Sequence, residues 1–210
     1  MVKGVIFDID GVLLDSMIIW NDLGARYLRS INVEPEPGLN EILFSMSMEQ
    51  GAEYLKEHYH LLRSSAKILN GISDMLKKFY YNEVLAKEGA RELMSFFKEK
   101  AIPMVAATSS PRSHVERALG RNEMLGFLDK IFTTGEVGVS KHSSKIYDIA
   151  AEHLGFNPSE ILVFEDSLYA LKTAKEAEYF AIGVYDEGGE KNQDGMYDTA
   201  DIYLEKLSEI

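Results

Sequence analysis

Short apolar segments, each too short for a helix, recur along the chain and constrain its fold most strongly. They read GVIF at 4–7, IPMVAAT at 102–108, KIFTT at 130–134, ILVF at 161–164 and YFAIGV at 179–184. Segments that are apolar throughout, without alternating polar residues, indicate strands buried on both faces, as in parallel sheets. We therefore expect a parallel sheet that is covered on both sides.

Helical patterns separate these segments from about residue 84 onward. Apolar residues fall on one stripe of a helix in the segments 88–100, 111–120, 143–155 and 167–178. Ser110 and Pro111 are expected to form the N-cap and first turn of the second of these helices. Residues 198–210 fit a short edge strand and a terminal helical turn. Strands that alternate with helices predict an α/β fold with a doubly wound parallel sheet.

Residues 16–82 interrupt this alternation. They contain helical patterns at 16–30, 47–59 and 65–81, with a turn-like stretch, NVEPEPG, at 32–38. A run of helices between the first and second strands predicts a small all-helical domain over 16–82. Residues 1–15 and 83–210 would then form the α/β core domain.

Composition narrows the function classes. The formal net charge of −12 disfavours nucleic acid or an anionic membrane as a partner. The chain has no cysteine, which excludes disulfides, thiolate metal sites and cysteine nucleophiles. No apolar stretch approaches the roughly 18 residues of a membrane span, and the N-terminal pattern is not that of a signal peptide. We expect a cytoplasmic protein and favour a monomer, although the residues leave the oligomeric state open.

Polar side chains gather where the predicted strands end. They are Asp8 and Asp10 after the first strand, Thr108 and Ser109 at the second, Glu165 and Asp166 at the fourth, and Lys141 in the polar loop GVSKHSS. In an open α/β sheet, ligands bind beyond the carboxyl ends of the strands. Carboxylates beside a buried strand are costly unless something compensates them, and a hard cation such as Mg²⁺ accepts oxygen ligands.

These residue types suit phosphoryl transfer. Asp8 and Asp10 would share a face in a strict strand, but their directions can diverge where the chain leaves the strand at Gly11. One carboxylate can attack phosphorus and form an aspartyl phosphate. A second can protonate the leaving oxygen and later deprotonate water. A lysine and a threonine add a cation and a hydroxyl donor for the phosphoryl oxygens.

Four segments, in order, resemble the motifs of the haloacid dehalogenase superfamily, in its branch of phosphatases and β-phosphoglucomutases with a helical cap. FDIDGVLLDS matches the first motif, VAATSS the second, VSKHSSKIYDIAAEHLG the third and ILVFEDSLYALKTAKEA the fourth. The resemblance spans the whole chain. The chain departs from the family pattern in two places. His142 and Ser144 replace the prolines of the third motif. Lys87 and Glu88 stand where a proline is frequent before Gly89, and we interpret this second departure as structural drift.

The resemblance implies a role for each matched residue. Asp8 would be the nucleophile and a metal ligand, and Asp10 the general acid/base, with its backbone carbonyl also on the metal. Thr108 and Lys141 would bind the phosphoryl group, and Glu165 and Asp166 would complete the Mg²⁺ shell. Ser109 is a further candidate for phosphate binding, and so is Ser110, for which the N-cap role is favoured. Trp20, the only tryptophan, is either part of the substrate pocket or ordinary packing.

The resulting prediction is a Mg²⁺-dependent phosphatase that acts on a small phosphorylated metabolite, such as a sugar or polyol phosphate. Three other protein classes fit the sequence less well. A dehalogenase needs no metal, whereas this chain has a full set of candidate metal ligands. A phosphoacceptor receiver domain is shorter than this chain, and a catalytically silent binding module would have lost one of the four motifs. The alternative is a β-phosphoglucomutase-type mutase. Such mutases resemble residues 42–55 but typically read GxSRxxSL there, so that Ser45 stands in place of the glycine and Met48 in place of the arginine. A second position that mutases tend to keep basic, just after the TSS stretch, is Pro111 in this chain. Arg26, Arg29 and Arg63 fall on other helices of the insert.

Overall fold

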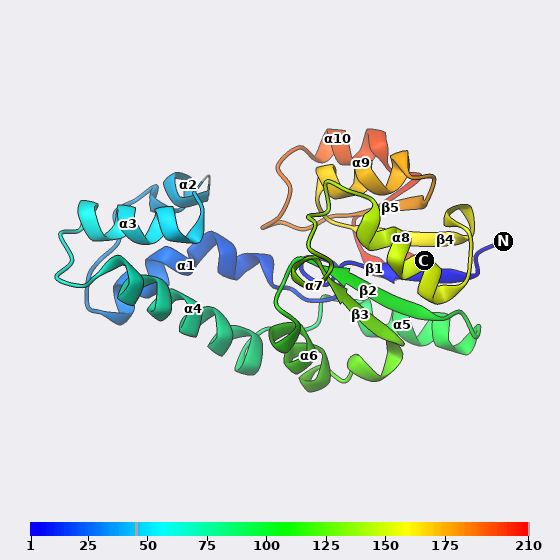
Figure 1. The fold of residues 1–210 in the computed structure, drawn as a ribbon, viewed down its shortest axis with the longest axis horizontal. Helices are drawn as coiled ribbons and strands as arrows, with labels where there is room; N and C mark the ends of the chain where they lie inside the picture. The colour runs from blue at the N-terminus through cyan, green and yellow to red at the C-terminus, as the bar shows by residue number, and fades with distance from the viewer. Residues whose placement is uncertain (45, 210) are drawn as a thin grey trace. The chain divides into compact units, whose positions relative to one another are not determined.

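The chain folds into two compact units in a computed structural model that describes residues 1–44 and 46–209 (Figure 1). One unit, here called the core unit, consists of Met1–Met17 and Val84–Ile210. The other, here called the helical unit, is Ile18–Glu83.

The core unit contains a six-stranded sheet with the strand order β3-β2-β1-β4-β5-β6, and every neighbouring pair is parallel. The strands are β1 (Gly4–Phe7), β2 (Met104–Thr108), β3 (Lys130–Thr133), β4 (Ile161–Glu165), β5 (Phe180–Val184) and β6 (Ile202–Leu204). Each predicted apolar segment supplies one strand, and β6 is the predicted edge strand. The expected α/β class with a parallel sheet is confirmed.

Helices connect these strands. They are α5 (Ala90–Glu99), α6 (Arg112–Arg121), α7 (Thr134–Val137), α8 (Lys145–Leu154), α9 (Leu168–Glu176) and α10 (Gln193–Thr199), with short 3₁₀ turns at Leu125–Phe127, Pro158–Glu160 and Leu207–Glu209.

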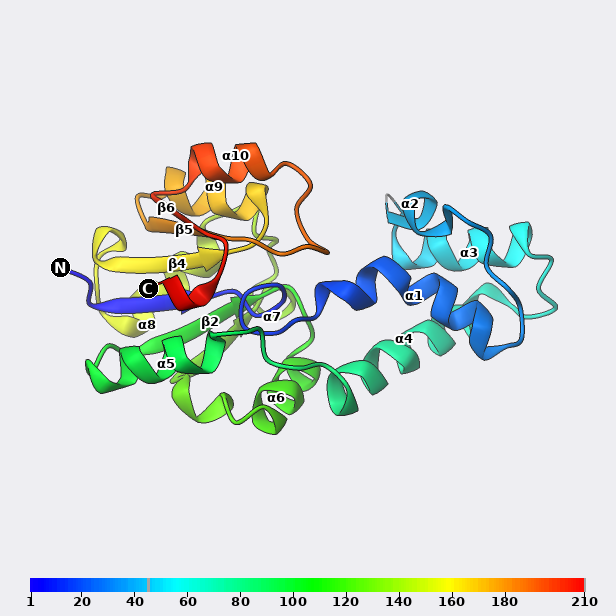
Figure 2. The ribbon, with the colours of Figure 1, turned by 180° about the vertical axis from the view of Figure 1, so that it is seen from behind.

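Both faces of the sheet are covered, as neighbouring residues of β1 illustrate. Because successive side chains of a strand point to opposite faces, Ile6 and Phe7 lie on different sides. Ile6 belongs to the buried cluster that includes Ile146 and Tyr147 of α8. The ring of Phe7 packs against Phe97 of α5, with centroids 6.1 Å apart. Helices α8 and α5 therefore lie on opposite faces of the sheet (Figures 1 and 2).

The helical unit contains α1 (Met17–Ser30), whose first residue belongs to the core unit, together with α2 (Leu39–Phe44), α3 (Met48–His58) and α4 (Ser65–Asn82). Ser47 caps α3 through a reciprocal pair of hydrogen bonds with Gln50, and the Ser64 side chain accepts from Lys67 N at the start of α4. The sequence did not predict α2, because six residues span less than two helical turns and show no periodic stripe. Leu28, Leu55 and Ile68 are fully buried and give the unit a core of its own.

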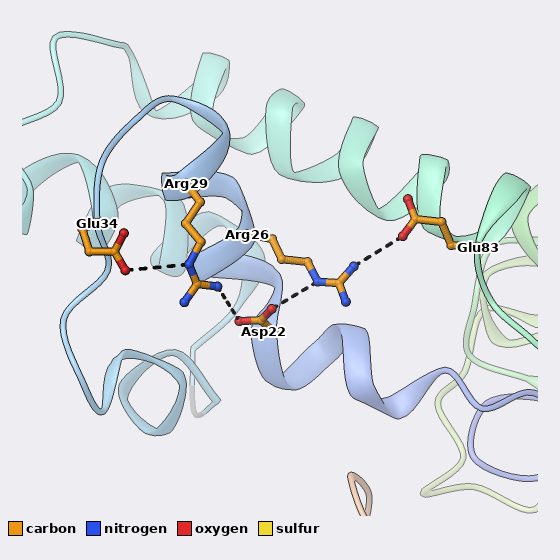
Figure 3. Close-up of polar contacts among 5 residues, drawn as sticks. All are labelled: Asp22, Arg26, Arg29, Glu34 and Glu83. Atoms are coloured by element: carbon orange, nitrogen blue, oxygen red, sulfur yellow. Dashed lines mark hydrogen bonds and ion pairs between the residues drawn. The ribbon is translucent and has the colours of Figure 1, made fainter.

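Two arginines of α1 share one aspartate (Figure 3). Arg26 Nε lies 3.2 Å from one Asp22 oxygen, and Arg29 Nη1 lies 3.5 Å from the other. Arg26 also reaches Glu83 at 3.5 Å, and Arg29 reaches Glu34 at 3.9 Å. The network ties α1 to the end of α4 and to the loop that follows α1.

Within the part of the chain that the structure describes, no helix combines the length and apolar character needed to cross a membrane.

Candidate active site

Four polar residues become neighbours because the strands are parallel and end at the same edge. Asp8 directly follows β1, Thr108 ends β2, and Glu165 ends β4, with Asp166 next in the chain. The backbone N–H of Asp8 donates to Phe164 O at 2.9 Å, which holds the end of β1 beside the end of β4. All four residues are at least nine-tenths buried, so their interactions are poorly screened by water.

Lys141 joins this group from the loop before α8. Its ammonium lies 2.6 Å from Asp8 Oδ1 and 2.7 Å from Glu165 Oε1, and its side chain is 2% exposed. The hydroxyl of Tyr147 donates to the same Glu165 oxygen at 2.6 Å. The other oxygen, Glu165 Oε2, is buried without a hydrogen-bond partner. An unpaired buried carboxylate oxygen is costly, which indicates that something absent from the polypeptide satisfies it.

Asp8, Glu165 and Asp166 form a candidate metal centre. Each offers a carboxylate oxygen, and the three oxygens lie within 4.8 Å of one another. Burial raises the pKa of Asp8 well above its usual value, and the charge of Lys141 only partly opposes this. Burial, together with the charge of Glu165, raises the pKa of Asp166 to about 8. Both shifts oppose the ionisation of Asp8 and Asp166 as they stand. A divalent cation with a preference for oxygen would counteract these shifts, because it would balance the two negative charges that three carboxylates and one lysine carry together.

Gly11 allows the loop after β1 to approach this centre. Its φ is +74°, and a Cβ at this position would lie 2.2 Å from Asp166 Oδ2. Any other residue would clash with Asp166 and be strained in its backbone.

Asp10 has different partners from Asp8. Its Oδ1 accepts a hydrogen bond from Ser16 Oγ, and its Oδ2 accepts one from Ser110 Oγ, both at 2.6 Å. The cluster of potential metal ligands does not include its side chain. The N-cap prediction for Ser110 is wrong: Pro111 occupies the N-cap of α6, Arg112 begins the helix, and no side chain caps it. The Ser110 hydroxyl instead donates to the carboxylate of Asp10.

The remaining predicted site residues lie in two places. Thr108 is fully buried, and its Oγ1 accepts from the N–H of Ser110 at 3.0 Å, whereas Ser109 is exposed at the same strand end. Trp20 belongs to the helical unit, where it lines a cavity of about 230 Å³ together with Leu23, Leu43, Met48 and Leu55. Ser45 falls outside the described residues.

Sequence reasoning did not predict three side-chain contacts with the carboxylates at this edge of the sheet. Ser16 and Ser110 bond to Asp10, and Tyr147 bonds to Glu165. Tyr147 is the tyrosine of the third motif, so the motif contained a signal for it. The ring of His142 stacks on Tyr169 with centroids 4.4 Å apart, so the residue that replaces a motif proline has a packing partner of its own.

Known proteins resemble this chain over most of its length. Residues 2–178 match the family model of the haloacid dehalogenase-like hydrolases. The phosphorylated carbohydrates phosphatase of Thermotoga maritima is 26% identical over 83% of this chain and 81% of its own length. The validoxylamine A 7'-phosphate phosphatase of Streptomyces hygroscopicus subsp. limoneus is 26% identical over 100% of this chain and 96% of its own length. Hexitol phosphatase B of Escherichia coli is 23% identical over 100% and 94% of the two chains.

Solved structures share the fold. A Thermotoga maritima protein assigned as a β-phosphoglucomutase superimposes with a TM-score of 0.88 at 24% identity, covering 98% of this chain and 95% of that one. A haloacid dehalogenase family hydrolase from Deinococcus radiodurans, solved with bound phosphate and sodium, gives a TM-score of 0.78 at 20% identity over 99% and 93% of the chains. The resemblance indicated by the four motifs is confirmed: the chain belongs to the haloacid dehalogenase-like hydrolase family and falls among its phosphatases.

Proposed function

We propose that the protein is a Mg²⁺-dependent phosphomonoester hydrolase that acts on a small phosphorylated metabolite through an aspartyl-phosphate intermediate on Asp8. The observation that carries this proposal is the buried cluster of Asp8, Glu165, Asp166 and Lys141 at the carboxyl edge of the sheet. A lysine beside three clustered carboxylates suits a site for an anion and a divalent cation better than it suits a purely structural ion pair.

The reaction has two steps in this proposal. The Asp8 carboxylate attacks phosphorus, the bond to the leaving oxygen breaks, and Asp10 donates a proton to that oxygen. Asp10 then takes a proton from water, which attacks the phosphoaspartate, releases inorganic phosphate and regenerates Asp8. Lys141 supplies positive charge, and Thr108 and Ser109 supply hydroxyl or backbone donors, to the phosphoryl oxygens.

Mg²⁺ would be held by Asp8, Glu165, Asp166 and the backbone carbonyl of Asp10. The all-oxygen donor set and the unpartnered Glu165 Oε2 support a hard cation at this place. When bound, such an ion neutralises charge on the transferred phosphoryl group. Hydrogen bonds from Ser16 and Ser110 would hold the Asp10 side chain apart from the ion, in reserve for proton transfer.

The substrate class proposed is a sugar or polyol phosphate. The curated relatives are named for phosphorylated carbohydrates, hexitol phosphate and validoxylamine A 7'-phosphate, which supports a small polyhydroxylated ester. We further propose that residues 16–82 form the cap domain and that residues 1–15 and 83–210 form the catalytic domain. The cavity lined by Trp20 is then the candidate for substrate selection.

The helical unit favours hydrolysis over mutase activity, because the described residues do not place a fixed arginine where a mutase would need one. A mutase must grip the far phosphate of a bisphosphate intermediate, which calls for a fixed arginine. Met48 stands at that position and lines the cavity. Arg26 and Arg29 are paired with carboxylates (Figure 3). Arg63 is exposed in the loop between α3 and α4 rather than on a helix as predicted.

Phosphorus NMR tests the proposal. The protein would be incubated with Mg²⁺ and a panel of sugar and polyol phosphates, and separately with β-glucose 1-phosphate plus a trace of glucose 1,6-bisphosphate. We expect inorganic phosphate from at least one member of the panel, and no accumulation of glucose 6-phosphate ahead of phosphate. Faster formation of glucose 6-phosphate would establish the mutase, and no release from any phosphomonoester would contradict both functions.

A further inference from the structure

We propose that Lys87 is a positioning residue of the active site: it bridges the loop after Asp10 to the loop beside Asp166. The inference rests on the proposed function for its catalytic consequence, but the bridge itself is a feature of the core unit. Its three contacts, described next and called the Lys87 bridge, correct the interpretation of this position as structural drift.

The ammonium of Lys87 uses all three of its hydrogens. It donates to the backbone oxygens of Gly11 and Tyr185, both at 2.6 Å, and to Asp186 Oδ2 at 2.7 Å. Its side chain is only 16% exposed, and that of Asp186 is 5% exposed. Burying a lysine ammonium costs free energy unless its three N–H groups donate hydrogen bonds. The side chain is therefore committed to this one arrangement, unlike an ordinary surface lysine.

The backbone of Lys87 reinforces the bridge. Its N–H donates to Leu13 O at 2.9 Å, and the N–H of Asp15 donates to Leu85 O at 3.0 Å. The segment before α5 is thus paired with the loop that follows β1, and the Lys87 side chain extends this pairing to Gly11.

One end of the bridge fixes the peptide next to Asp10. Gly11 follows Asp10 directly, and its Cα lies so close to Asp166 that no Cβ fits. Holding the Gly11 carbonyl restrains the backbone that carries the Asp10 side chain. A proton donor is effective only within hydrogen-bond reach of the leaving oxygen, so a small displacement of this backbone is costly.

The other end fixes the loop beside Asp166. Asp186 Oδ1 accepts from the N–H of Gly188 at 2.9 Å, and Asp186 O accepts from the N–H of Gly189 at 3.2 Å. A Cβ on Gly189 would lie 3.0 Å from Asp166 Oδ2, so this turn packs directly against that carboxylate. Lys87 also offsets the charge of Asp186 next to the acidic cluster. A single side chain therefore holds both loops that flank Asp166.

Kinetics on matched lysine variants test the inference. Lys87→Met keeps the length and removes the donors, Lys87→Arg restores donors, and Lys145→Met removes an exposed lysine of α8 as a control. We expect Lys87→Met to lower kcat about 10- to 100-fold on an alkyl phosphate, with little change in KM, because misplacement of a catalytic group acts mainly on the chemical step. The loss should be smaller on p-nitrophenyl phosphate, whose leaving group needs no proton. Lys87→Arg should recover part of the rate, and Lys145→Met should match wild type.

Hydrogen–deuterium exchange, measured without Mg²⁺ or substrate, tests the bridge independently of activity. Lys87→Met should speed exchange at the amides of Leu13 and Leu14 and at those of Gly188 and Gly189, while the strand amides stay protected. If Lys87→Met does not fold, Asp186→Asn should speed exchange at Gly188 and Gly189 and lower kcat.

The two measurements separate the inference from the proposed function. A wild-type protein without phosphatase activity would contradict the function and leave the exchange result to decide on the bridge. In an active enzyme, unchanged exchange in both loops would overturn the inference. So would an unchanged kcat for folded Lys87→Met, or an equal loss of kcat on both substrates.

Discussion

The ammonium of Lys141 lies 2.6 Å from Asp8 Oδ1, and both residues are more than nine-tenths buried. Burial alone would lower the pKa of Lys141, but the charges of Asp8 and Glu165 outweigh it and raise the pKa above its usual value. The lysine therefore stays charged throughout the physiological range. It is a fixed cation beside the carboxylate that we propose as nucleophile, placed to meet a phosphoryl group.

Asp10→Asn should separate acid–base catalysis from nucleophilic attack. The amide keeps the size of the side chain and can still accept a hydrogen bond from Ser16 or Ser110, but it cannot donate a proton as a carboxylic acid does. We expect kcat on alkyl phosphates to fall roughly 100- to 10,000-fold, with a smaller loss on p-nitrophenyl phosphate. Steady-state kinetics on both substrates measure this, and equal losses would contradict the role.

Metal removal should abolish activity reversibly. Excess EDTA should stop phosphate release, and Mg²⁺ should restore it. Full activity in EDTA would refute a metal-dependent mechanism.

Asp166→Ala should raise the Mg²⁺ concentration needed for half-maximal activity, because it removes one of three clustered carboxylates. Ca²⁺ should inhibit, since its larger and looser coordination shell misplaces Asp8 relative to phosphorus. Asp148→Asn, on the exposed side of α8, is a control that should leave the Mg²⁺ requirement unchanged.

Arg112 and Glu136 provide a stability test with a defined pH dependence. Hydrogen bonds from Arg112 Nε and Nη2, both 2.6 Å long, lower the pKa of Glu136 from 4.5 to about 2. A carboxylate with a depressed folded-state pKa stabilises the fold above its unfolded pKa and loses that contribution as the pH falls toward the folded value. The pair is half exposed, so its contribution should be at most about 1 kcal/mol.

Urea unfolding at a series of pH values checks this expectation. The difference in unfolding free energy between wild type and Glu136→Gln should be constant near pH 7 and shrink below pH 4.5, in the window between the two pKa values. Glu152→Gln, an exposed change on α8, serves as the reference. A difference that grows on acidification would show that the ion pair does not stabilise the folded state.

The sequence predicted the sheet better than the contacts around the site. The segments 4–7 and 161–164 became β1 and β4 almost residue for residue, because uninterrupted apolar runs record burial on both faces. The grouping of Asp8 with Glu165 followed from the parallel arrangement, since parallel strands end at one edge. Both predictions depend on local pattern and general topology.

The Lys87 bridge and the partners of Asp10 depend on something else. Lys87 contacts residues 76, 98 and 99 positions away in the chain, and Ser110 reaches Asp10 across 100 positions. No local pattern contains such pairings. For Ser110 the local signal was misleading, because a serine before proline and a helix is also typical of an N-cap. Long-range hydrogen bonds in the folded chain decided between the two uses of that side chain.

The most direct test of the central claim is the detection of the phosphoryl group on Asp8. Wild-type protein with Mg²⁺ and its best substrate would be quenched in acid within the first turnover, digested and analysed by mass spectrometry. The peptide that contains Asp8 should gain the mass of one phosphoryl group, and fragmentation should place it on Asp8. Asp8→Asn should remain folded, show no such adduct and release no phosphate. Steady phosphate release by Asp8→Asn, or a phosphoryl group on another residue, would contradict the account.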